Sequence, residues 1–78
     1  MTLGADQRRA LAMLATAPNG VTQSLLTLYG FHASMVAELV GRGLASMTQE
    51  KVRAGSGLVE VVTIRITEAG RDALAVKG

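Results

Sequence analysis

The sequence predicts a small α+β domain that is mainly α: a three-helix bundle, a two-stranded β-hairpin and a short C-terminal helix. Two patterns support this prediction. Apolar residues recur at three- and four-residue spacing as far as about residue 41, and two β-rich segments follow between residues 45 and 66. The chain has 78 residues, a formal net charge of +2 and no cysteine. We therefore interpret residues 1–78 as one domain that rests on a hydrophobic core.

The predicted helices each have one apolar face. In the first, from residue 5 to 17, this face consists of Ala10, Leu11, Met13, Leu14 and Ala17. Thr22 is expected to cap the second helix, whose buried residues are Leu25, Leu26 and Tyr29. In the third helix the apolar residues are Met35, Val36, Leu39 and Val40. Gly41 and Gly43 end this helix.

The predicted hairpin has a two-residue turn at Gly55-Ser56. This turn pairs Met47 with Ile64 and Lys51 with Glu60 across the strands. The inner side of the hairpin is then formed by Val62, Ile64 and Ile66.

Three further segments complete the predicted core. Thr67 is expected to cap a final helix from Glu68 to about Val76, with an inward face of Ala69, Ala73 and Leu74. Val21 is interpreted as an isolated extended residue between the first two helices. The methionines expected in the core are Met13, Met35 and Met47.

Four short segments connect this element order to a known family. They are Gly20-Val21-Thr22, Gly30-Phe31, Arg42-Gly43-Leu44 and the run from Ile66 to Leu74, ITEAGRDAL. With them, residues 3 to 74 resemble the winged helix-turn-helix superfamily, and look most like the DNA-binding core of MarR-type transcription regulators. The resemblance implies a winged helix that acts in transcription regulation and contacts DNA through its third helix and its hairpin wing.

Two departures from the family pattern affect this expectation. The third helix reaches Gly43-Leu44 about one turn earlier than in the family, so the helix that would read DNA is short. The long flanking helices through which MarR-type regulators dimerise are not expected here either. A dimer of this chain would have to form in another way.

The candidate DNA-binding residues are His32, Ser34, Arg42, Lys51 and Arg53. Those on the third helix offer hydrogen bonds to bases or phosphates, and the cations beside the hairpin turn offer phosphate contacts in double-stranded DNA. The alternative is that the helix residues only form a solvated face. Lys51 would then pair with Glu60 across the strands.

A second hypothesis makes the domain a protein-interaction module. The candidate interface residues are Val52, Val59 and Val61, which project from the outer face of the hairpin. The partner would be a second copy in a homodimer made by strand pairing, or a larger regulator of which the chain is an accessory subunit. Cations dispersed beside an apolar patch would favour this hypothesis, whereas one continuous positive side would favour DNA.

The sequence predicts neither an enzyme nor a metal or cofactor site. Without cysteine there is no thiolate nucleophile, and His32 is the only histidine, with Ser34 as its one nearby hydroxyl. No apolar run is long enough to span a membrane, and no signal peptide is expected, so the predicted location is the cytoplasm. No small-molecule site is identifiable.

Overall fold

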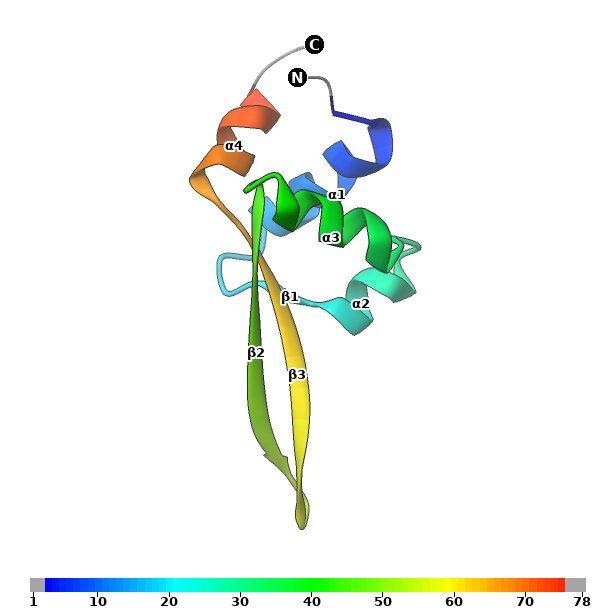
Figure 1. The fold of residues 1–78 in the computed structure, drawn as a ribbon, viewed down its shortest axis with the longest axis vertical. Coiled ribbons are helices and arrows are strands. Elements are labelled where there is room, and N and C mark those ends of the chain that lie inside the picture. Colours follow the sequence, from blue (N-terminus) through cyan, green and yellow to red (C-terminus); the bar gives the residue numbers. More distant parts are fainter. Residues whose placement is uncertain (1–2, 76–78) are drawn as a thin grey trace.

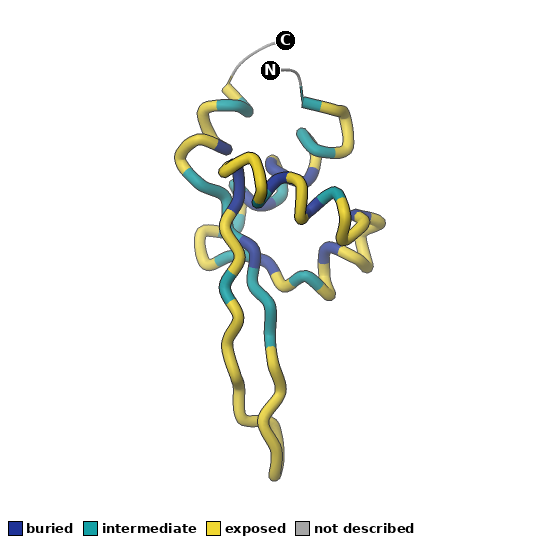
Figure 2. The backbone as a smooth tube through the Cα atoms, viewed as in Figure 1, coloured by how far each residue is buried: buried dark blue, intermediate teal, exposed yellow. Residues whose placement is uncertain are grey.

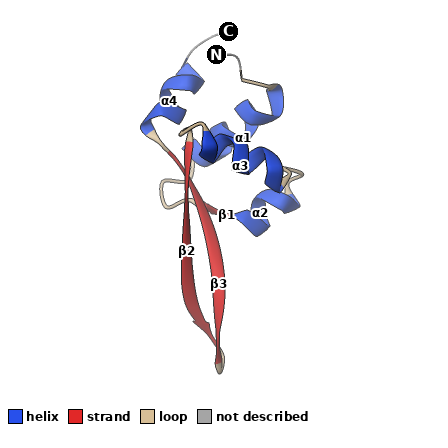
Figure 3. Cartoon of the chain, in the orientation of Figure 1, coloured by secondary structure: helices blue, strands red, loops and turns tan. Residues whose placement is uncertain are grey.

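The computed structural model describes residues 3–75, which form an α+β fold of four helices and a three-stranded antiparallel sheet (Figure 1). The elements are α1 (Ala5–Ala15), β1 (Val21–Thr22), α2 (Gln23–Leu28), α3 (Ala33–Gly41), β2 (Ala45–Ala54), β3 (Gly57–Ile66) and α4 (Glu68–Ala75). The helices gather around one end of the sheet, and β2 and β3 continue beyond them (Figure 3). The α+β class and the order of helices and hairpin are as predicted.

The register of the hairpin confirms the prediction. Met47 lies opposite Ile64 and Lys51 lies opposite Glu60, with Gly55-Ser56 as the turn. Gly55 has a φ of 61°, and no residue other than glycine has a positive φ in the described part of the chain. A positive φ at the first turn residue alone is the pattern of a type II′ turn, which matches the right-handed twist of paired strands.

The sheet contains a third strand, so the prediction of a two-stranded sheet is wrong. In β1, Val21 lies opposite Ile64 and Thr22 lies opposite Thr63, which gives the strand order β1-β3-β2. Val21 and Ile64 are both buried. Backbone groups at a buried position need hydrogen-bond partners, and pairing with β3 supplies them to Val21.

One hydrophobic core joins the helices to the base of the sheet. Its buried residues are Ala10, Leu11, Leu14, Val21, Leu26, Phe31, Val36, Leu39, Leu44, Ala45 and Ile64. Partly buried residues that pack against this core include Met13, Met35, Val62 and Ile66. The predicted apolar faces of α1 and α3 are therefore confirmed, as is the inward orientation of Val62, Ile64 and Ile66.

The shorter helices bury fewer residues than predicted. In α2 only Leu26 is buried, whereas Leu25 and Tyr29 are exposed. This helix has six residues, about one and a half turns, so its core-facing stripe is narrow. In α4 the buried residue is Gly70, while the predicted Ala69 is exposed. Val76, the predicted end of this helix, lies outside the described residues.

Met47 is 52% exposed, so the prediction that its side chain lies in the core is wrong. Its cross-strand partner Ile64 is fully buried. A hollow of about 120 Å³ lies beside Met47, and α3 contributes Ala33 and Ala37 to its lining. Because alanine side chains are short, α3 does not cover Met47 as it covers the strand residues nearer the base.

A close contact joins the end of β3 to the loop after α3. The Thr67 hydroxyl donates a hydrogen bond to the Gly43 carbonyl at 2.6 Å and accepts one from the Gly70 N–H at 3.1 Å, which confirms Thr67 as the cap of α4. At Gly70, a Cβ atom would lie 2.1 Å from the Leu44 carbonyl oxygen. Glycine is therefore required for α4 to approach the start of β2 this closely.

The outer half of the hairpin has no helix packed on it. Every residue from 49 to 60 is exposed (Figure 2). The molecule is correspondingly elongated, with principal extents of 49 × 22 × 21 Å. We call residues 49–60 the distal hairpin. None of the helices within residues 3–75 is long and apolar enough to cross a membrane.

Candidate functional site

The exposed side of α3 carries little positive charge. His32 is the N-cap residue of this helix, and its side chain makes no capping hydrogen bond. Ser34 is also exposed. Arg42, at the other end, pairs with Glu38 at 2.7 Å. The structure thus places His32 and Ser34 at one end of the helix and the predicted contact Arg42 at the other, with the Arg42 charge balanced by a carboxylate.

The cations of the distal hairpin are also balanced by carboxylates. Lys51 and Arg53 lie on the same face of the sheet as Ile64, since residues two apart on a strand share a face. Glu60 lies directly opposite Lys51, although no ion pair within 4.0 Å joins them in the described chain. Glu50 supplies a second carboxylate. Two cations and two carboxylates give the distal hairpin no net charge.

The two arginines of α1 make contacts within the domain. Arg8 donates a hydrogen bond to the Leu74 carbonyl at 3.2 Å and so connects α1 with α4. Arg9 lies 3.5 Å from Asp6, and its guanidinium stands 5.9 Å from the centre of the Phe31 ring. These contacts engage both arginines of α1 in intramolecular interactions.

The two faces of the distal hairpin differ in composition. We call the face that continues the helix-covered side of the sheet the inner face; in the distal hairpin it carries Gln49, Lys51, Arg53, Leu58 and Glu60. The outer face carries Glu50, Val52, Ala54, Gly57 and Val59, with Val61 just beyond the distal hairpin. The outer face is therefore mostly apolar, and the inner face holds three of the four charges.

Large apolar side chains of the distal hairpin are in contact with solvent. Val52 and Val59 lie opposite each other on the outer face and are 46% and 50% exposed. Leu58, on the inner face, is 63% exposed. Val61, the third predicted interface valine, is half-buried. The structure thus brings Val52 and Val59 together as predicted and adds Leu58, which is not among the predicted interface residues.

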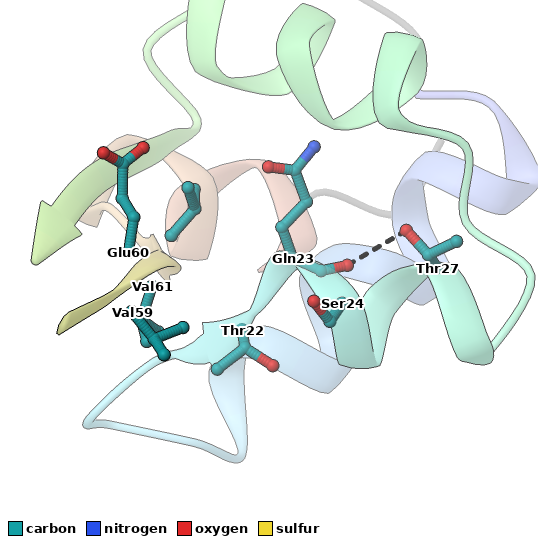
Figure 4. Close-up of a pocket in the computed structure, with 8 residues that line it drawn as sticks. Thr22, Gln23, Ser24, Thr27, Val59, Glu60 and Val61 are labelled. Atoms are coloured by element: carbon teal, nitrogen blue, oxygen red, sulfur yellow. Dashed lines mark hydrogen bonds between the residues drawn. The ribbon is translucent and has the colours of Figure 1, made fainter. Parts of the chain in front are cut away.

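A groove of about 440 Å³ lies between α2 and the outer half of β3 (Figure 4). Its lining residues are Thr22, Gln23, Ser24, Thr27, Val59, Glu60, Val61 and Val62. The Thr27 hydroxyl donates a hydrogen bond to the Gln23 carbonyl at 3.0 Å, so it is engaged within α2. This groove was not predicted from the sequence, because it forms only where β1 ends and α2 turns away from β3.

A second exposed apolar patch lies on α2. It consists of Leu25, Leu28 and Tyr29, of which Leu28 is 82% exposed. Spacings of three and four residues place these side chains on one side of the helix, and this signal was present in the sequence. The groove residues Gln23, Ser24 and Thr27 occupy another side of α2.

The described residues contain no group of three or more His, Cys, Asp or Glu side chains able to hold a metal ion. The candidate site consists of the distal hairpin, with its apolar outer face, its mixed inner face and the groove beside α2.

No protein-family model matches the sequence, and neither the curated proteins nor the solved structures include a match.

Proposed function

We propose that the chain is a winged helix-turn-helix domain whose wing, the β2–β3 hairpin, binds another protein. The element order supports the winged-helix assignment. The helices α2 and α3 are joined by a short turn, the hairpin follows α3 directly, and α4 follows the hairpin. A short strand, β1, also pairs with β3 next to α2.

The exposure of apolar side chains on the distal hairpin carries the proposal of protein binding. Val52, Leu58 and Val59 are 46–63% exposed, and no described helix covers them. A two-stranded ribbon without a covered face is marginally stable in water. A protein surface docked on the ribbon would remove apolar side chains from water. This burial is favourable by roughly 25 cal/mol per Å² of apolar area.

The charge distribution favours protein over DNA as the partner. DNA binding draws its affinity from cations that neutralise phosphates. Of the three predicted cationic contacts, Arg42 is paired with Glu38, and Lys51 lies across from Glu60. The distal hairpin has no net charge, and Val52 and Val59 lie side by side on its outer face.

Site-specific photo-crosslinking in the cells that make the protein tests this proposal. A photoreactive amino acid at Leu58 is expected to give a discrete protein adduct. The same amino acid at Asp72, which is exposed on α4, is the matched control and should give none. The Leu58 adduct should also disappear when Val52→Thr and Val59→Thr are added. Equal labelling from both positions, or no protein adduct from Leu58, would contradict protein binding by the hairpin.

DNA remains the second candidate because Lys51 and Arg53 share the inner face, on the same side of the sheet as α3. Titration with random duplex DNA at two salt concentrations separates the two functions. We expect weak binding that Lys51→Glu/Arg53→Glu changes little. A wild-type affinity that falls steeply with salt and is lost in this double variant would replace the protein partner with DNA.

A further inference from the structure

The outer half of β3 has a neighbouring strand on one side only. β1 pairs with Thr63 and Ile64, whereas β2 pairs with all of β3. In a hairpin with a two-residue turn, the pair beside the turn exchanges two hydrogen bonds, and such pairs then alternate with pairs that exchange none. The N–H and C=O groups of Leu58, Glu60 and Val62 therefore point away from β2. Within residues 3–75 no strand lies beside this stretch of β3.

The space beside this edge is open. The groove of about 440 Å³ lies along Val59, Glu60, Val61 and Val62. A further strand needs a position about 4.8 Å from β3. Main-chain donors and acceptors therefore face this open space at every second residue of β3. Another extended peptide backbone can supply hydrogen-bond partners to these N–H and C=O groups.

We propose that two copies of the chain pair through this edge of β3, antiparallel about a two-fold axis at Val59. Across the two distal hairpins, four strands then lie in the order β2-β3-β3-β2. This inference rests on the proposed function, because it names a second copy as the protein that the hairpin binds. In this register Leu58 lies opposite the partner's Glu60, and Glu60 lies opposite the partner's Leu58. Each of these pairs exchanges two main-chain hydrogen bonds.

The side chains match in this register on both faces. On the outer face, Val52 and Val59 continue into the partner's Val59 and the partner's Val52, which makes one row of valines across four strands. β-branched side chains in adjacent strands stabilise sheets. On the inner face, Glu60 lies beside the partner's Leu58, and the next side chain in that row is the partner's Arg53. Like charges do not face one another.

The opposite edge of the hairpin is unsuited to the same pairing. Opposite Val59, Glu60 and Val61 of β3, two-fold pairing of β2 with itself would be centred on Val52, Lys51 or Glu50. These registers place Glu50 opposite the partner's Glu50, Lys51 opposite the partner's Lys51, or Lys51 opposite the partner's Arg53. Like charges directly opposite one another destabilise a sheet, and cations on an edge strand prevent such pairing. Residues 57–62 of β3 contain one charge, Glu60.

The pairing also fits the end of β1. With Val59 on the axis, the partner's Gly57 lies opposite Val61, so the partner's strand ends before Thr63, where β1 is already paired. The two helical ends then point in opposite directions along the sheet. Each copy gains two strands beside the free edge of its β3.

Cysteine crosslinking tests the register, because the chain has no cysteine of its own. In the paired sheet the two Val59 Cα atoms would be about 4.5 Å apart, which is within disulfide range. Val59→Cys should therefore form a disulfide-linked dimer under mild oxidation. Val52→Cys is the matched control, because it is similarly exposed on the same face. Three strand spacings, about 14 Å, separate it from its counterpart. We expect linkage of Val59→Cys to be faster by on the order of tenfold or more.

Proline substitutions test the main-chain bonds by sedimentation equilibrium. Glu60→Pro removes an N–H that points into the groove and leaves the hydrogen bonds to β2 in place. Lys51→Pro makes the same change in the same cross-strand pair, on the other edge. The wild-type chain and Lys51→Pro should dimerise, and Glu60→Pro should stay monomeric with an unchanged circular dichroism spectrum.

Each contrary result has a defined meaning. A monomeric wild-type chain, equal linkage of the two cysteine variants, or equal loss in both proline variants would overturn the pairing of β3 edges. If the Leu58 photo-crosslink then joins the chain to a different protein, binding by the hairpin stands and only self-pairing fails. If Leu58 gives no protein adduct either, both proposals fail.

Discussion

The two halves of the hairpin have the same backbone ladder and opposite environments. On one face of β3, Ile64 is fully buried and Leu58 is 63% exposed, although both are branched aliphatic residues on the same strand. The difference is the presence of α1 and α3 over the base of the sheet and their absence over the distal hairpin. Alternation along the strand therefore orients a side chain, and only the neighbouring elements bury it.

The largest difference in stability is expected when an aliphatic side chain on the inner face of β3 is shortened in each half of the hairpin. Ile64→Ala should lower the free energy of unfolding by about 2–5 kcal/mol, because it removes a fully buried side chain from a packed core. Leu58→Ala should change it by no more than about 0.5 kcal/mol in the monomer. Urea unfolding of both variants at low protein concentration measures the difference. Similar losses would mean that the distal hairpin is covered in the monomer.

A smaller loss is expected at the contact between α4 and the start of β2. Gly70→Ala would place its Cβ 2.1 Å from the Leu44 carbonyl oxygen, so α4 has to shift. We expect destabilisation of about 1–3 kcal/mol. Gly41→Ala, with no atom within 4 Å of its added Cβ, is the control and should be neutral or stabilising by up to about 1 kcal/mol. Thermal unfolding compares the two, and equal melting temperatures would argue against the close approach.

The smallest effect concerns the hydroxyl that caps α4. Thr67→Val removes the hydrogen bonds to Gly43 and Gly70 and should cost about 1–2 kcal/mol, as expected for loss of an N-cap. Thr27→Val removes a bond within the exposed helix α2 and should cost less. Chemical denaturation of both variants checks the order. A larger loss at Thr27 would place more of the stability in α2 than its exposure suggests.

Much of the fold could be predicted because it depends on local chemistry. Helical spacing located α1 and α3, and Gly55-Ser56 fixed the whole β2–β3 register, since a two-residue turn leaves one way to pair the strands. Thr22 and Thr67 were recognisable as caps by their position before a helix, and the hydrogen bonds to the N–H groups of Leu25 and Gly70 confirm them.

The candidate site was less predictable. Val52 and Val59 were selected correctly as exposed neighbours, because alternation assigns them to the outer face. The pairing of Arg42 with Glu38 was missed, although their spacing of four residues on a helix is a known signal for an ion pair. The exposure of Leu58 was not evident, because the alternating pattern continues beyond the point where the helices stop covering the sheet.

The sequence alone determined where the helices and the two hairpin strands begin, which side chains share a face, and how β2 and β3 align. These properties follow from backbone geometry and turn chemistry within short segments. The tertiary structure decided that Val21 and Thr22 form a third strand, that Gly70 lies against Leu44, and that Met47 and Leu58 contact solvent. Burial and long-range pairing depend on which elements come to lie beside one another, and a local pattern does not contain that information.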